Sequence, residues 1–161
     1  MQNRYVTDIQ IHAARFGELD PTTLYALLKL RVDIFVVEQE CPYPELDGRD
    51  TEPTAWHVWA ASDGELLGYL RVLQDPDGTA RIGRVCTAAA GRGRGVAGGL
   101  MARAIAEIGD RPSRLDAQSY LVGFYARYGY SPTGPEYVED GIPHVPMARP
   151  ATAGDATAAP R

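Results

Sequence analysis

Residues 91–99 combine repeated glycines with two arginines, Arg92 and Arg94, directly before an apolar helical pattern. A helix that begins near Val96 exposes unpaired backbone N–H groups, and its dipole favours negative charge there. Glycine lets the backbone approach a phosphate closely, and the arginines can add charge-assisted hydrogen bonds. The stretch therefore predicts an anion site. The plain alternative is a flexible connection with solvated arginines.

Two nucleotide-binding motifs compete for the same stretch. A nucleoside-triphosphate P-loop requires Gly-Lys-Ser/Thr, and that sequence is missing here. Gly93-x-Gly95-x-x-Gly98 does satisfy the dinucleotide fingerprint, and Asp116 lies near the expected acidic position. That fingerprint normally belongs to the first βα unit, whereas here a helix and several strands are expected before it. Too little chain follows to complete a doubly wound domain.

The sequence offers few candidates for proton transfer. His57 lies on an expected strand and is a candidate general base, since histidine titrates near neutral pH. A lone strand histidine is more often structural. The segment 40–53 carries prolines and many carboxylates and is expected to be a long functional loop. Its acidic residues, together with Glu38, would form a rim that attracts a cationic amine. The alternative is that they are solvated surface residues without a function.

The two cysteines, Cys41 and Cys86, have neither metal-ligand nor C-x-x-C spacing. Cys86 lies in mid-strand, where a buried, inert thiol is expected rather than a covalent relay. Cys41 lies in the loop, which leaves open whether its thiol is exposed.

The elements that position these residues can be read from turn signals and periodicity. Asp20-Pro21 opens a helix with an apolar face that runs on to Phe35. Strands are expected at 56–60, 66–73 and 80–87, as a meander with a hairpin turn at Asp63-Gly64. A helix follows from Val96 to Ile108.

The last third predicts a strand at 114–118, a helix at 121–128 stopped by Gly129, and two further strands joined through Glu139-Asp140-Gly141. The whole order predicts an α/β (mixed α+β) fold, a mixed sheet with helices on both faces. We expect a single domain over residues 1–149 and a disordered tail over residues 150–161, which are rich in Ala, Thr, Gly and Pro.

Composition narrows the function further. The 161 residues are 45% hydrophobic and 23% charged, which suits one globular domain. A formal net charge of −5 argues against a nucleic-acid binder. No signal peptide or membrane span is visible, so we expect a cytoplasmic protein that uses no metal and no membrane.

Arg92-x-x-Gly95-x-Ala97 after a strand resembles the Q/R-x-x-G-x-G/A signature of the GCN5-related N-acetyltransferase (GNAT) superfamily. Residues 124–130, Phe-Tyr-Ala-Arg-Tyr-Gly-Tyr, resemble its late Y-x-x-x-G-F/Y motif, and the resemblance covers most of the chain. More narrowly, residues 30–43, 82–85 and 139–144 resemble the ElaA-like branch. Gln118 stands where many relatives carry asparagine.

The resemblance implies a GNAT fold, a mostly antiparallel twisted sheet, and acetyl-coenzyme A (acetyl-CoA) as co-substrate. Tyr125 matches the family tyrosine that protonates the departing thiolate, and Val85, Cys86 and Thr87 match the strand edge along the pantetheine arm. Acceptor contacts are expected from Glu38, Glu40 and Tyr43. The expected coenzyme contacts are Val85, Cys86, Thr87, Arg92, Gly93, Arg94, Gly95, Val96, Ala97, Gln118 and Tyr125.

The implied function is N-acetyl transfer from acetyl-CoA to a small-molecule or peptide amine, by direct attack in a ternary complex. Two alternatives stay open: a non-catalytic coenzyme A sensor and an enzyme similar to the acyl-homoserine lactone synthases. A homodimer is compatible with the sequence, which identifies neither the acceptor nor the general base.

Overall fold

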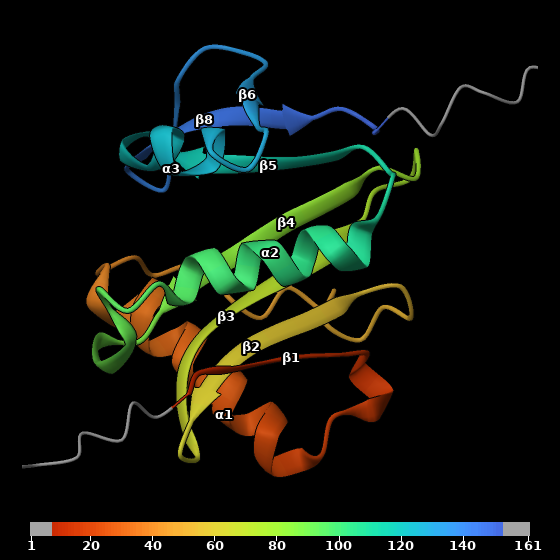
Figure 1. Cartoon of the computed structure of the whole chain (residues 1–161). Helices are drawn as coiled ribbons and strands as arrows, with labels where there is room; N and C mark the ends of the chain where they lie inside the picture. The colour runs from red at the N-terminus through yellow and green to blue at the C-terminus, as the bar shows by residue number, and fades with distance from the viewer. Residues whose placement is uncertain (1–7, 153–161) are drawn as a thin grey trace, which may run out of the picture.

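The computed structural model describes residues 8–152. The chain begins with a strand, continues with a helix and a three-stranded meander, and then alternates helices with strands (Figure 1). The strands are β1 Gln10–Ala14, β2 Trp56–Ser62, β3 Glu65–Gln74, β4 Ala80–Thr87, β5 Ser113–Gln118, β6 Ser131–Pro132, β7 Tyr137–Glu139 and β8 Ile142–Arg149. The α-helices are α1 Pro21–Val32, α2 Val96–Ile108 and α3 Val122–Ala126.

All eight described strands belong to one sheet, in the order β1-β2-β3-β4-β5-β8-β6, with β7 paired to β8. Only β4 and β5 run parallel, whereas the other paired strands run antiparallel. Parallel neighbours need a crossover connection, and α2 supplies it between β4 and β5. The predicted mixed, mostly antiparallel sheet is confirmed.

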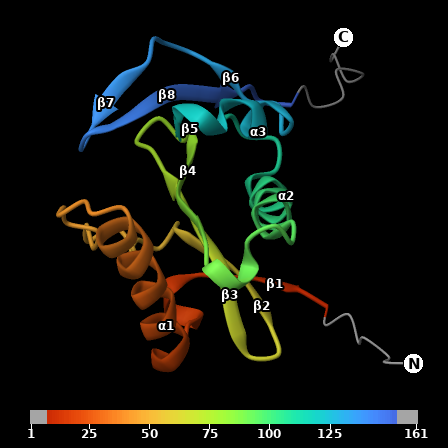
Figure 2. The same ribbon diagram turned by 90° about the vertical axis from the view of Figure 1, so that its left-hand side faces the viewer.

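Helices cover both faces of this sheet, as predicted. Figure 2 shows α1 on one side of the strands and α2 with α3 on the other. The predicted stripe of α2 is buried in the larger core at Val96, Leu100, Met101, Ala104 and Ile108. On the opposite face, Leu27 of α1 packs with Ile34, Tyr69 and Cys86 in a smaller cluster.

The first helix starts where the sequence predicts it, because the Asp20 side chain accepts a hydrogen bond from the Thr23 N–H at 2.8 Å. Its end differs from the prediction. After Val32 the chain continues as a π-helix, Asp33–Glu38, whose wide turns include a 3.0 Å bond from Gln39 N–H to the Ile34 carbonyl. Local widening of this kind often occurs at functional sites, and this one carries Phe35 and Glu38.

Turn signals were accurate in the hairpins. Asp63 and Gly64 both have positive φ, 49° and 75°, as a two-residue type I′ turn requires. Asp140 and Gly141 repeat this geometry between β7 and β8.

The end of the chain and the last helix differ in detail from expectation. α3 ends at Ala126, and its first turn is a 3₁₀ segment, Ser119–Leu121. β8 ends at Arg149, and Thr152 Oγ1 donates a hydrogen bond to Asp110 at 2.8 Å. The rest of the predicted disordered tail, residues 153–161, lies outside the described residues, as do residues 1–7.

Candidate active site

The sheet opens between its two parallel strands. β4 and β5 are in register only at Ala80 with Ser113 and at Arg81 with Arg114, and beyond this point they diverge (Figure 1). A cavity of about 730 Å³ lies along the separated strands. It reaches from the π-helix and the 40–53 loop on one side to α3 and the β7–β8 hairpin on the other. This volume is in the range of small-molecule sites.

The glycine-rich loop forms one end of the cavity. A smaller hollow of about 220 Å³, lined by residues that include Gly93, Gly95 and Val96, shares Thr87, Arg92, Ala97 and Phe124 with the main cavity. Gly95 is the N-cap of α2 and has φ 73°. The N–H groups at the start of α2 have no carbonyl partner within the helix and are available to an anion.

The two loop arginines behave differently. Arg92 lines the cavity and donates from Nη2 to both carboxylate oxygens of Glu38, at 2.6 and 2.8 Å. Arg94 is exposed and contacts the Ala90 carbonyl, outside the residues that line either hollow. The structure therefore brings Arg92 and Glu38 together, across the entrance between the loop and the π-helix.

The dinucleotide interpretation is not supported by the surroundings of its key residues. Asp116 forms an ion pair with Arg81 at 3.1 Å. A Cβ on Gly98 would lie 2.8 Å from the Tyr128 hydroxyl, so Gly98 allows α2 to pack against the turn that follows α3. A doubly wound domain also needs a parallel sheet, which is missing from the described strands.

Tyr125 and Gln118 lie on the wall opposite β4. Both line the cavity, and Tyr125 is only 5% exposed, with its ring edge-on to Phe124 at 5.1 Å. Burial raises the pKa of Tyr125 above its ordinary value. The hydroxyl is therefore protonated at neutral pH and able to donate.

The edge of β4 lines the cavity through Val85, Cys86 and Thr87. A β-bulge interrupts its pairing with β3: Cys86 lies opposite Tyr69 and Gly83 opposite Arg71, which leaves Arg84 and Val85 out of register. Arg84 has a positive φ of 54°. The bulge frees backbone groups at this point from the ladder with β3.

The Cys86 thiol does not suit a covalent relay. It is 6% exposed, and burial, helped by the nearby Glu45 charge, raises its pKa to about 12. The predicted inert thiol agrees with this geometry. The loop position left the exposure of Cys41 open, and the structure buries it: it is 8% exposed, and its Sγ lies 3.8 Å from the Asp140 carbonyl oxygen.

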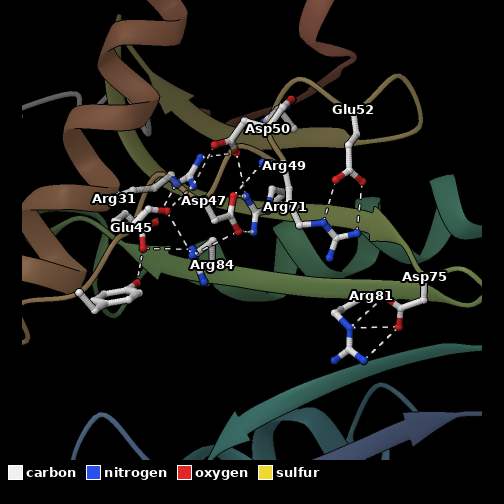
Figure 3. Close-up of polar contacts among 12 residues, drawn as sticks. Arg31, Glu45, Asp47, Arg49, Asp50, Glu52, Arg71, Asp75, Arg81 and Arg84 are labelled. Carbon is white, nitrogen blue, oxygen red and sulfur yellow. Dashed lines mark hydrogen bonds and ion pairs between the residues drawn. The ribbon is translucent and has the colours of Figure 1, made fainter.

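The acidic loop forms a buried ion-pair network instead of an open rim (Figure 3). Arg31 of α1 is fully buried and donates to Glu45 at 2.8 Å and to Asp50 at 2.7 Å. Arg71 of β3 donates to Asp50 at 3.0 Å and to both oxygens of Asp47. Glu45, Asp47 and Asp50, three of the carboxylates that were expected to attract an amine, are thus already paired with arginines.

Arg84 joins the same network from the bulge of β4. Its Nη2 donates to the Glu45 backbone carbonyl at 3.1 Å, and its Nε lies 3.0 Å from Glu45 Oε2. Burial alone would raise the pKa of Asp47, but hydrogen bonds and charge from Arg71 outweigh it and hold that pKa well below its usual range. The network fixes the loop over the cavity.

Sequence reasoning missed this network. Its members are spread over α1, the loop, β3 and β4, so no local spacing reveals them. The signal that could have revealed it is composition. The loop is rich in carboxylates, and the cations of the chain are almost all arginine, the side chain best suited to buried ion pairs.

His57 is not brought into the cavity. Its side chain is 1% exposed, Nε2 lies 2.9 Å from the Asp50 carbonyl, and Nδ1 lies 2.7 Å from the Tyr69 hydroxyl. The carbonyl can only accept, so Nε2 carries the proton and Nδ1 accepts from Tyr69. Burial also lowers the pKa of His57. Because both ring nitrogens already have hydrogen-bond partners, His57 has a structural role.

The predicted acceptor residues are divided between cavity and surface. Glu38 and Tyr43 line the cavity, and the Tyr43 hydroxyl donates to Glu45. Glu40 is absent from the lining and has φ 51° at the end of the π-helix. The structure thus separates Glu40 from the other two.

A histidine that the sequence did not single out does line the cavity. His144 of β8 donates from Nδ1 to the Ile142 carbonyl at 2.7 Å, and its ring stacks on Tyr137 of β7. Its register partner across the sheet is Gln118 of β5. The segment 139–144 had been noted only for its family resemblance.

Within residues 8–152, we found no cluster of three or more His, Cys, Asp or Glu side chains arranged to hold a metal ion. In the same range, every helix is too short or too polar to cross a membrane.

Comparison with known proteins agrees with this site. A family model described as an acetyltransferase (GNAT) domain matches residues 35–150. A UPF0039 protein of Mycobacterium tuberculosis is 51% identical over 83% of this chain and 88% of its own length.

Two solved structures are similar over nearly their full length. An acyl-CoA N-acyltransferase from Pseudomonas aeruginosa has a TM-score of 0.83 at 42% identity, and ElaA of Escherichia coli has a TM-score of 0.83 at 38% identity. Each match covers 88% of this chain and 99% of the other. This chain therefore belongs to the GNAT acetyltransferase family, as an acyl-CoA acyltransferase similar to ElaA.

Proposed function

We propose that the protein transfers an acetyl group from acetyl-CoA to a primary amine, by direct attack while both substrates are bound. The observation that carries this proposal is the cavity between the diverging strands β4 and β5. It joins the anion-binding start of α2 at one end to a buried tyrosine and a charged acceptor side at the other. The amine belongs to a small molecule or a peptide.

The residues present suit coenzyme A. The N–H groups at the start of α2 and the guanidinium of Arg92 can hold its pyrophosphate. The edge of β4 from Val85 to Thr87 can pair with the extended pantetheine arm, as an added strand would. When bound, acetyl-CoA supplies an acetyl group already activated as a thioester.

The protein's own groups then align and move protons. A backbone N–H at the β4 bulge, next to Val85, can polarise the acetyl carbonyl. The Tyr125 hydroxyl donates its proton to the departing sulfur. Because burial raises the pKa of Tyr125 well above that of a thiol, positioning contributes more to this step than driving force.

The test measures coenzyme A release across a library of small amines and peptides, together with coenzyme A affinity. Wild type is expected to release the thiol with some amines. Tyr125→Phe is expected to lower kcat by about 10²-fold with little change in affinity.

Tyr128→Phe is the matched control, because this tyrosine lies on the same segment and packs against Gly98 and Phe124 outside the cavity. Turnover of Tyr125→Phe equal to wild type would remove Tyr125 from the mechanism. Tight coenzyme A binding without release for every acceptor would identify a non-catalytic sensor.

A further inference from the structure

His144 stands on the acceptor side of the cavity, held in place by two neighbouring strands. It lies in β8 opposite Gln118 of β5 and opposite Tyr137 of β7. Its ring stacks on the Tyr137 ring with centroids 5.8 Å apart and planes 23° from parallel. Gln118 and His144 line the same cavity as Tyr125. The stacking and the two strand pairings restrict the orientation of the imidazole.

The hydrogen bond of His144 determines which nitrogen is free. Nδ1 lies 2.7 Å from the Ile142 backbone carbonyl, which can only accept a hydrogen bond. Nδ1 therefore carries the proton in the neutral ring, and Nε2 keeps its lone pair. His57 differs in this respect, because Tyr69 already donates to its accepting nitrogen.

We propose that Nε2 of His144 accepts the proton of the attacking amine, which makes His144 the general base of the proposed acetyl transfer. This inference rests on the proposed function. The amine nitrogen forms a bond to the acetyl carbonyl carbon, and the bond from that carbon to sulfur breaks. One amine proton moves to Nε2, and the sulfur receives the proton of Tyr125. The imidazolium then loses its proton to water, and the tyrosine regains one, so the enzyme returns to its starting state.

The charges around His144 suit this role. On the hairpin, Glu139 and Asp140 line the cavity beside it, and on β5 Asp116 lines it from the next strand. Arg81 of β4 forms an ion pair with Asp116 at 3.1 Å and also pairs with Asp75. The two hairpin carboxylates remain to stabilise positive charge on the incoming amine and on the imidazolium.

The hairpin is also fixed to the opposite side of the cavity. The Sγ of Cys41, which follows the π-helix, lies 3.8 Å from the Asp140 carbonyl. This weak contact adds to the pairings of β8 with β5 and β7, which hold the imidazole in position for proton transfer.

The experiment compares His144→Asn with His12→Asn, using the amine that wild type acetylates fastest. An asparagine at position 144 can still donate to the Ile142 carbonyl but lacks the accepting nitrogen. His12 is exposed on β1, stacked on Trp59 and remote from the residues that line the cavity. We expect His144→Asn to lower kcat/KM at pH 7 by about 10²-fold or more, and His12→Asn to leave it unchanged.

Two further readouts separate a base from a merely structural residue. The loss in His144→Asn is expected to shrink as pH rises to about 9, because bases in the solution can then take the amine proton in place of His144. Added imidazole is expected to restore part of the activity of His144→Ala, and none is expected for Tyr125→Phe. Coenzyme A affinity stays within about twofold of wild type in both His144 variants.

The outcomes distinguish this inference from the function on which it rests. A wild-type protein that releases no thiol with any amine overturns the proposed function and this role together. Normal wild-type turnover with an equally active His144→Asn overturns only the role of His144. A parallel loss of coenzyme A affinity in His144→Asn would also overturn it, because the residue would then be structural.

Discussion

Replacing Glu38 with glutamine should tighten coenzyme A binding. Glu38 holds Arg92 through two contacts of 2.6 and 2.8 Å, and the two side chains are 50% and 49% exposed. A phosphate that takes Arg92 must break this pair. Exposed ion pairs contribute about 0.2–1 kcal/mol, so removing the competing carboxylate should lower the Kd for coenzyme A by about 1.4- to 5-fold.

Calorimetric titration with coenzyme A measures this effect, at low and at high salt. The gain should shrink at high salt, where exposed charges are screened, and should vanish in an Arg92→Gln background. Glu40→Gln is the matched control, since it removes a nearby charge outside the cavity lining. Weaker binding by Glu38→Gln, or an equal gain in Glu40→Gln, would refute the idea that Glu38 competes with phosphate for Arg92.

Three further predictions concern the buried groups. Arg31→Met removes one of the two cationic partners of each of two buried carboxylates, Glu45 and Asp50, and should cost about 3 kcal/mol in thermal or urea unfolding, whereas Lys29→Met, which breaks an exposed pair on the same helix, should not change stability measurably. Because Asp47 has a lowered folded pKa, the unfolded state binds more protons below about pH 4, so wild type should lose stability as pH falls through this range. In Asp47→Asn, the free energy of unfolding should fall less steeply with decreasing pH than in wild type. An equal slope in the two proteins would contradict the role of Asp47. With a pKa of about 12, Cys86 should resist iodoacetamide at pH 7.5 in the native protein and react after denaturation, as mass spectrometry would detect.

The fold could be predicted largely because its signals are local. The Asp20 cap, the two hairpin turns at Asp63 and Asp140, and the apolar stripe of α2 each depend on a few neighbouring residues. The π-helix after Val32 was missed for the opposite reason. Its apolar residues continue the helical spacing of α1, and only the tertiary packing of Ile34 beneath the sheet distinguishes the wider turns.

The loop proposed to hold the acyl donor is visible in the sequence, whereas the residues proposed for the acceptor side are much less so. The loop from Arg92 to Ala97 is contiguous, so its pattern is visible in the sequence. The acceptor side is assembled from Glu38, the 40–53 loop, β4 and the β7–β8 hairpin, and only the fold shows that they meet. Histidines occur on strands without any catalytic role, so nothing in the sequence indicates that His144 is a better candidate for a general base than His57. The direction and hydrogen bonds of each ring make that distinction.

The buried network and the β4 bulge are best understood together. A non-glycine residue in the left-handed region costs on the order of 1–3 kcal/mol and persists only where its surroundings hold it. Arg84, with φ 54°, is held by Glu45 and by Asp47, which lies 3.5 Å from its guanidinium. Those carboxylates are in turn fixed by the arginines of α1 and β3. The loop thus stabilises a strained backbone at the bulge that interrupts the pairing of β4 with β3, beyond the end of its pairing with β5. Loosening the loop should therefore disturb the edge of β4 that we propose to bind the acetyl group, even though the ion pairs themselves lie outside that edge.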